Sequence, residues 1–262
     1  MFQRQPLFGR MLSQVLLIVA VFIVVLPLVL IVQQSLQGQG LDNYLAVLTQ
    51  TPFLTFIGNS GVIALITVAI VLVLSMSAAY AVDVLRPRWS TPISILIFGG
   101  LSLPAIAIVV PLFSLIQALG LLDTYWAVII PLVAGSIPFG VLLSGTHLRA
   151  LPKEIHEAAK IDGASSFRFL ISILVPLSRP ILAVVAIFTF LSAWNEYVIP
   201  LIFIQSSDMQ VATQVPTFFE SQHLVDVAKV LAANALISVP VVLAYVVLQR
   251  QFRQGLSGGA VK

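Results

Sequence analysis

The chain offers few residues for catalysis. Cysteine is absent, which removes thiol chemistry, disulfides and iron–sulfur clusters. Residues 156–160 have the sequence HEAAK, close to the zinc motif H-E-x-x-H, but Lys160 stands where the second histidine would have to be. The loop G-x-x-x-x-G-K-S/T, which holds nucleotide phosphates, does not occur either. We therefore expect no metal site, no cofactor bound by this chain and no enzymatic activity of its own.

Three adjacent residues, Trp194, Asn195 and Glu196, interrupt an otherwise apolar stretch. An acid inside a membrane-spanning helix costs about 2.5–3.5 kcal/mol, so it normally faces the bundle interior or a water-filled cavity. Such residues can line a pathway for a polar solute, because amides and carboxylates bind hydroxyl groups and an aromatic ring packs on C–H groups. The alternative is that Glu196 lies near the outer headgroups, or pairs with a neighbouring helix and only stabilises the bundle. The sequence leaves both interpretations open.

The composition predicts that the chain lies in a bilayer. Hydrophobic residues make up 59% of it and charged residues only 9%, whereas soluble domains contain about 25% charged residues. A helix needs about 20 apolar residues to cross the hydrocarbon core, and the uncharged runs here are far longer than the roughly 10-residue strands of a barrel. We predict an all-α, polytopic membrane protein with a single transmembrane domain over residues 1–262. Its six expected transmembrane helices are 11–35, 58–82, 92–118, 124–147, 178–204 and 230–249.

Positive charges are distributed unequally between the two sides of this predicted bundle. Of the 13 Lys and Arg, all but Lys229 fall in the N-terminus, the 83–91 loop, the 148–179 segment or the C-terminus. Cytoplasmic loops carry the excess of Lys and Arg in membrane proteins. We therefore expect both termini to be cytoplasmic.

Residues 148–177 form the one long segment on the basic side. Pro152 suits the first turn of a short helix, and Gly163 predicts its left-handed stop. Ser165 or Ser166 is then expected to cap a second helix. Such a compact segment suits docking to a protein partner, and the alternative is a helix that rests on lipid headgroups.

The same segment resembles the EAA loop, the signature of permease subunits of binding-protein-dependent ABC importers. The pattern is EAA-x3-G-x9-I-x-L-P, and Val175 stands at its usual leucine. The matching positions are Glu157, Ala158, Ala159, Gly163, Ile173 and Pro176. Longer stretches, among them SAWNEYVIP and the ending GLSGGAVK, are similar to the second permease subunit of maltose-type carbohydrate importers.

The resemblance implies a set of partners. They are a homologous second permease, two cytoplasmic ATPase subunits that use ATP and Mg²⁺, and an external solute-binding protein, in the plasma membrane of a bacterium or archaeon. Membrane lipid surrounds the pair, and no nucleic acid is expected. The chain would form half of the translocation pathway for a sugar or sugar-like solute and work by alternating access.

The resemblance also implies roles for particular residues. A coupling helix seated in a cleft of one ATPase would contain Glu157, Ala158, Ala159, Asp162 and Gly163. The C-terminal tail, with Arg250 and Arg253, is a further candidate contact to the ATPases.

Two rival functions stay open. A permease for glycerol phosphate or its diesters shares these motifs, although a phosphate route would favour Arg or Lys within the spans, where the sequence has none. An autonomous channel or secondary carrier would need no EAA loop. The external segments 36–57 and 205–228 are the candidate docking surface for a binding protein.

Overall fold

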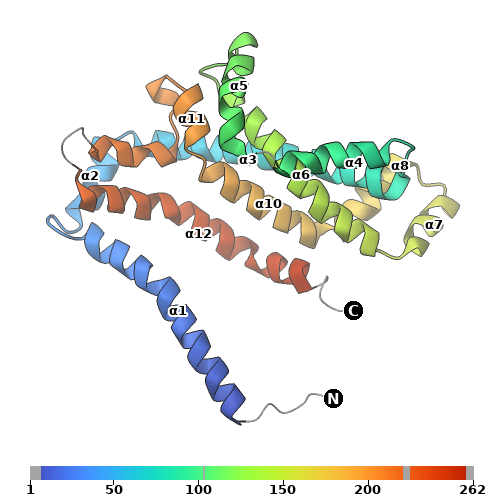
Figure 1. Cartoon of the computed structure of the whole chain (residues 1–262), viewed down its shortest axis with the longest axis horizontal. Coiled ribbons are helices and arrows are strands. Elements are labelled where there is room, and N and C mark those ends of the chain that lie inside the picture. The colour runs from blue at the N-terminus through green and yellow to red at the C-terminus, as the bar shows by residue number, and fades with distance from the viewer. Residues whose placement is uncertain (1–6, 103, 221–224, 258–262) are drawn as a thin grey trace. The chain divides into compact units, whose positions relative to one another are not determined.

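The computed structural model describes residues 7–102, 104–220 and 225–257. Within these ranges the chain is helical and its only β interaction is an isolated bridge between Glu220 and Val225, which confirms the all-α prediction. The elements in chain order (Figure 1) are α1 (Leu7–Ser35), α2 (Asp42–Gln50), α3 (Phe53–Ala79), η1 (Tyr80–Leu85), α4 (Ser90–Gly99), η2 (Gly100–Ser102), α5 (Ala105–Ala118), α6 (Tyr125–Ala150), α7 (Lys153–Ile161), α8 (Ser166–Phe169), η3 (Leu170–Leu174), α9 (Val175–Leu177), α10 (Arg179–Trp194), α11 (Val198–Phe203), η4 (Ser207–Met209), η5 (Ala212–Phe219) and α12 (Val227–Ser257).

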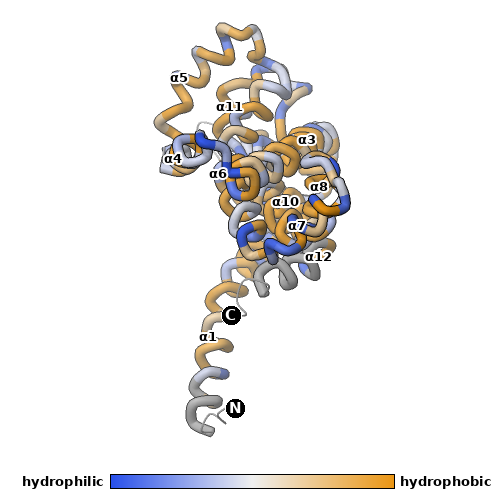
Figure 2. The backbone as a smooth tube through the Cα atoms, turned by 90° about the vertical axis from the view of Figure 1, so that its right-hand side faces the viewer, coloured by the Kyte–Doolittle hydropathy of each residue, from blue (hydrophilic) through white to orange (hydrophobic). Residues whose placement is uncertain are grey.

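Helices long and apolar enough to cross a membrane account for most of the chain. Four of them are single helices, at Ser13–Ser35, Phe53–Leu85, Tyr125–Ala150 and Val227–Val247. Two more spans result if each bent pair of helices is one span, which gives the six that the sequence predicts. Figure 2 shows α1 hydrophobic along most of its described length, as a helix in lipid requires.

The first of the two bent pairs interrupts the helix expected at 92–118, and the second bends where the helix expected at 178–204 begins. That expected helix is itself divided into α10, which ends at Trp194, and α11, which begins at Val198. The first pair, Ser90–Ser102 with Ile106–Ala118, turns by 110° next to Pro104. The second, Ser166–Leu177 with Arg179–Trp194, turns by 79° at Ser178. Pro180 has no amide hydrogen to donate to the carbonyl four residues earlier, and a missing helical bond of this kind bends a helix.

Two compact units divide the chain. One contains residues 1–53 with 215–238, and the other contains 54–214 with 239–262. In the first unit, the buried amide of Asn43 donates to the carbonyls of Ser35 and Gln37, 2.9 Å away in each case. These bonds satisfy backbone groups at the end of α1 and fix α2 against it.

The second unit is organised around α6. This helix packs against α10, α4, η1, α5 and α11. Gly140 permits a close approach to α3, since a β-carbon there would lie 2.7 Å from Ser75 Cβ. With 26 residues α6 is about 39 Å long, so it joins the end of the unit that contains α5 and α11 to the end that contains α7 (Figure 1).

Candidate functional site

The helix predicted in the EAA-like segment is α7, and its two ends are fixed by the residues that the sequence indicated. Pro152 precedes the helix with ψ 135°. At the other end Gly163 adopts φ +72°, and its amide donates to Lys160 O at 3.1 Å. The amide of Ala164 donates to Ala159 O at 2.9 Å. This pair of bonds is the Schellman arrangement, in which a glycine lets the chain leave a helix sharply.

The second helix of the segment begins directly after this turn. Ser165 is extended, with ψ 156°, and its hydroxyl oxygen accepts a hydrogen bond from the Arg168 amide at 3.3 Å. Ser165 rather than Ser166 is therefore the cap. The turn between α7 and α8 thus has defined bonds on both sides.

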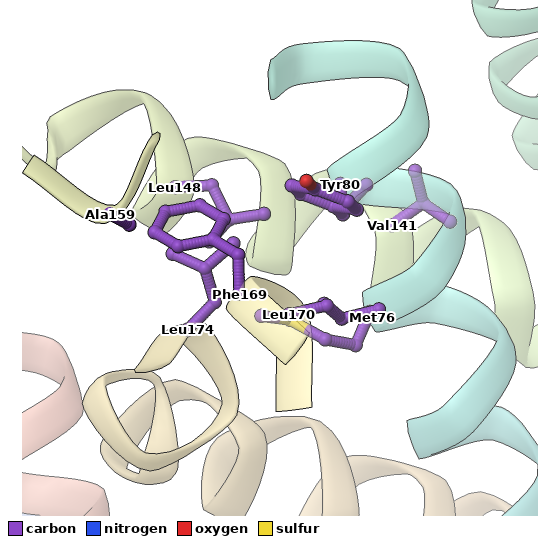
Figure 3. Packing of buried hydrophobic residues seen from close by; sticks show 9 residues of the cluster. Met76, Tyr80, Val141, Leu148, Ala159, Phe169, Leu170 and Leu174 are labelled. Carbon is purple, nitrogen blue, oxygen red and sulfur yellow. The ribbon is translucent and has the colours of Figure 1, made fainter. Parts of the chain in front are cut away.

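One face of α7 is anchored in a hydrophobic cluster. Ala159 is only 5% exposed and contacts a group of buried side chains from several helices, while Leu151 and Ile155 pack beside it. Among the other residues predicted for the coupling helix, the side chains of Glu157, Ala158 and Asp162 are exposed. Of the two adjacent alanines, Ala159 is therefore buried in the cluster and Ala158 faces away from it. The buried members of the cluster, shown in Figure 3, are Met76, Ala79, Tyr80, Val141, Leu148, Ala159, Phe169, Leu170 and Leu174.

Phe169 is the centre of the aromatic contacts in this cluster. Its ring centroid lies 4.7 Å from that of His156 on α7 and 6.1 Å from that of Tyr80. Tyr80 begins η1 and Leu170 begins η3, and both segments are π-helical. Single turns of π-helix inside longer helices occur often at functional sites. The helix α7 is thus packed directly on two points where helices depart from regular α geometry.

An ion pair joins α6 to η1 at the same end of the second unit. Arg149 Nη1 on α6 lies 2.5 Å from Asp83 Oδ1 on η1. Sequence analysis did not identify this pair, because its members are 66 positions apart. The only available signal was an acid at the end of an apolar run, on the side that carries most of the basic residues.

The three candidate pathway residues lie at a helix end and not inside a continuous span. Trp194 is the last residue of α10 and is buried. The side-chain amide of Asn195 donates a hydrogen bond to Leu191 O at 2.9 Å. Glu196 Oε1 accepts hydrogen bonds from the Val198 amide at 2.9 Å and the Ile199 amide at 3.1 Å. Glu196 therefore caps α11, a local role that fits the structural alternative and leaves the pathway role a prediction.

At the opposite end of the second unit, hydrogen bonds hold the first part of segment 205–228, which the sequence predicts to be external. Asn59 donates to the carbonyls of Asp208 and Gln210, 2.8 Å away in each case. The Tyr125 hydroxyl donates to Asn59 Oδ1 at 2.8 Å, which fixes the orientation of the amide. The Ala212 amide donates to Ser60 Oγ at 2.9 Å. Sequence analysis did not single out these residues, because a polar residue near the end of an apolar run does not indicate its partner.

Asp123 holds the start of that segment. Its carboxylate accepts hydrogen bonds from the Ser206 hydroxyl and from the amides of Ser206 and Gln205. These bonds, the one from the hydroxyl first, hold the pKa of Asp123 below its ordinary value because they stabilise the charged form. Residues 205–212 are therefore fixed at several points along their length.

The candidate tail contacts lie at the end of α12. Arg250 and Arg253 are within the helix, which the structure describes to Ser257. Their side chains and residues 258–262 lie outside the described part of the chain. Their proposed contact to an ATPase stays a prediction.

Known proteins resemble this chain over most of its length. The probable ABC transporter permease protein YurM of Bacillus subtilis is 33% identical over 204 residues, which cover 78% of this chain and 68% of that protein. The trehalose/maltose transport system permease protein MalG of Thermococcus litoralis is 32% identical, over 85% of this chain and 81% of that protein. The diacetylchitobiose uptake system permease protein NgcG of Streptomyces coelicolor is 29% identical, over 95% and 88%.

Solved structures share the fold. A bacterial ABC transporter involved in the import of the acidic polysaccharide alginate has a chain that matches with a TM-score of 0.79 and 21% identity, over 96% of this chain and 99% of that one. Residues 73–258 also match the family model described as the binding-protein-dependent transport system inner membrane component. Because this match covers well over half of the chain, the protein belongs to the family of binding-protein-dependent transport system inner membrane components.

Proposed function

We propose that this chain is one of two permease subunits in an ATP-driven importer of a sugar or sugar-like solute. Family membership supports the importer class. Relatives named for lactose, trehalose and maltose, and diacetylchitobiose favour a carbohydrate as the solute class. The fold neighbour that takes part in alginate import is consistent with the same class.

The geometry of α7 is the observation that carries the mechanism. Ala159 fixes one face of the helix in the protein's own core, while Glu157, Ala158 and Asp162 present an acid-bearing surface with little bulk. A helix held on one side and exposed on the other is suited to receive a push from a bound neighbour and to pass it inward. The interior is densely packed, so a displacement of α7 is transmitted and not absorbed.

The proposed cycle begins at two cytoplasmic ATPase subunits. They bind ATP with Mg²⁺, and their closure moves α7 together with Phe169 and Leu174 beneath it. Tyr80 and Leu148 in the same cluster carry this motion to the long helices α3 and α6. The spans then change from an inward-open to an outward-open arrangement, and the two permeases together enclose the solute.

The orientation of the chain in the membrane follows in this proposal from its charges. The basic side, with α7 and both termini, faces the cytoplasm. The fixed segment 205–212 then faces outward, where an external binding protein delivers solute. Trp194, Asn195 and Glu196 stay candidate pathway residues beside that segment, because Glu196 O accepts a hydrogen bond from Thr213 Oγ1 at 2.9 Å.

The test compares two exposed acids on the same helix. Glu157→Ala and Glu154→Ala are reconstituted in proteoliposomes with the ATPases and the binding protein, and ATP hydrolysis and solute uptake are both measured. We expect Glu157→Ala to weaken ATPase association or to lower uptake per ATP by about tenfold, as expected for one buried interface contact worth about 1.4 kcal/mol. Glu154→Ala should behave like the parent, and the affinity of the binding protein for solute should not change.

Two results would overturn the proposal. Equal coupling in both variants would mean that α7 does not receive the ATPase. Solute uptake by the chain alone, without any ATPase, would identify an autonomous channel or carrier.

A further inference from the structure

A cavity of about 300 Å³ lies beside α7, and the proposed coupling mechanism assigns no ligand to it. Its walls come from η1, the end of α6, α7 and the start of the following helical segment. Its apolar lining consists of the buried Leu148, Phe169 and Leu174 together with Val84, Leu151, Pro152 and Ile155. The remainder of the lining is dominated by charged and polar side chains, which belong to Asp83, Arg86, Arg149, Lys153, His156, Glu157 and Lys160.

The spacing on α7 places four of these side chains on one face. Lys153, His156, Glu157 and Lys160 are related as i, i+3, i+4 and i+7, which is one stripe of a helix. This helix therefore contributes two lysines and only one carboxylate to the cavity wall. Neither lysine forms an ion pair with any other residue that the structure describes.

The opposite wall adds further positive charge. Arg149 is already paired with Asp83, so that this acid is occupied. Arg86 forms no ion pair within the described ranges, and its Nε donates to the backbone carbonyl of Asp83 at 3.0 Å. That bond directs one edge of the guanidinium to the backbone and leaves its other N–H groups available at the wall of the cavity.

Arg86 occupies a backbone conformation that favours glycine. Its φ is +48° and its ψ is 58°, and its amide donates to Ala81 O at 3.1 Å to end η1. Left-handed residues other than glycine cluster at ligand sites, where surrounding structure holds them in place. His156, which also lines the cavity, has a buried Nδ1 with no hydrogen-bond partner in the described structure.

We propose that this cavity binds a phosphate-type oxyanion, held by Lys153 and Lys160 on one side and by Arg86 on the other. A planar guanidinium and two ammonium groups are suited to the several oxygens of a phosphate. The cavity volume is at the lower end of the range for small-molecule sites, so it accommodates a phosphate with a small attached group. The source of the phosphate is either a free cytoplasmic molecule or the headgroup of an anionic lipid.

Such a site goes beyond the transport function and does not depend on it. An anion bound here would link η1, α6 and α7, and α7 is the helix that moves in the proposed cycle. Binding is measured on the chain alone, without ATPases or solute, so its outcome is separate from that of the transport experiments.

The test uses the full chain in nanodiscs of phosphatidylcholine, with inorganic pyrophosphate as the soluble probe and isothermal titration calorimetry as the readout. A second arm replaces part of the lipid by phosphatidylglycerol and counts bound lipid by native mass spectrometry. The variant is the double substitution Lys153→Gln, Lys160→Gln. Its matched control is Arg168→Gln, an exposed cation on the same segment that does not line the cavity.

We expect the double variant to weaken binding of the effective probe by about tenfold or more, and Arg168→Gln to leave it unchanged. Glu157→Gln should strengthen binding, because it removes the unpaired carboxylate that opposes the anion. This gain cannot result from misfolding. Binding of pyrophosphate supports a free phosphate compound as the source, and selective retention of phosphatidylglycerol supports a lipid headgroup.

Equal binding by the double variant and the control would overturn the proposal, and so would the absence of binding in both arms. Loss of ATPase association in the double variant, with neither probe bound, would assign the cavity to a carboxylate of the partner protein and likewise overturn it.

Discussion

The carboxylate of Asp83 lies directly against Gly145, so closely that a β-carbon at position 145 would overlap Asp83 Oδ2. The same carboxylate receives Arg149 Nη1 at 2.5 Å. The glycine therefore provides the space in which the end of η1 is paired with the end of α6. The ion pair and the helix contact depend on each other, although Asp83 is far from Gly145 and Arg149 in the sequence.

Gly145→Ala should separate this pair and destabilise the protein by about 1–3 kcal/mol, since an added carbon in a packed contact must displace its neighbours. Gly135→Ala on the same helix is the control, because a β-carbon there meets nothing within 4 Å. That control should be neutral or slightly stabilising, by up to about 1 kcal/mol, because alanine favours a helix more than glycine does. Thermal unfolding in detergent compares the two, and equal effects would contradict the close contact at position 145.

The sequence predicted features that depend on neighbouring residues. The runs without charged residues predicted the helices. Gly163, with Ser165 or Ser166 after it, predicted the turn between α7 and α8. The size and direction of the bends at Pro104 and Ser178 were not predicted, because the direction in which a proline-weakened helix turns depends on what packs against it. The Asp83–Arg149 pair and the bonds of Asn59 join distant positions, and one sequence contains no signal for which polar residues meet. Glu196 was identified as unusual, but its capping role required knowledge that α10 ends at Trp194.

Asp123 should make the stability of the segment 205–212 depend on pH. Its folded-state pKa is lowered, so its contribution is fully present above the unfolded-state value of about 4 and is lost as the pH falls through the lower folded-state value. Asp123→Asn keeps a residue that tolerates the observed φ of +59° but removes the charge that accepts three hydrogen bonds. We expect this variant to melt earlier than the parent at pH 7. The difference should shrink below pH 4, and an unchanged difference across this range would contradict the assignment.

Glu196 can be tested with two substitutions that separate its possible roles. Glu196→Ala removes the acceptor for the amides of Val198 and Ile199 and should cost about 1 kcal/mol, as the loss of a helix cap does. Glu196→Gln keeps one acceptor oxygen and should retain most of the stability. If Glu196 also contacts solute, both variants should change the concentration dependence of uptake while assembly persists. Normal uptake kinetics in Glu196→Gln would restrict the residue to its capping role.

Gly163 should be required for the geometry of α7 more than for the overall fold. Gly163→Ala forces a β-carbon into the left-handed conformation, at a cost of about 1–2 kcal/mol, while asparagine occupies that region more readily. We expect the ratio of solute uptake to ATP hydrolysis to fall in Gly163→Ala and to be largely kept in Gly163→Asn. A β-carbon at this position meets no atom within 4 Å, so an effect of alanine reports backbone strain and not a clash. Equal coupling in both variants would mean that the turn after α7 does not transmit force.

Labelling of introduced cysteines can determine the orientation of the chain, because the parent sequence contains no cysteine that would also react. Single substitutions Lys153→Cys on α7 and Ser207→Cys in the fixed segment 205–212 place one thiol at each end of the second unit, and both parent residues are exposed. A membrane-impermeant maleimide added to intact cells should label Ser207→Cys and should reach Lys153→Cys only after permeabilisation, because the excess of Lys and Arg predicts that α7 faces the cytoplasm. The reverse pattern would place α7 outside, where no ATPase could act on it, and would contradict both the topology and the coupling mechanism.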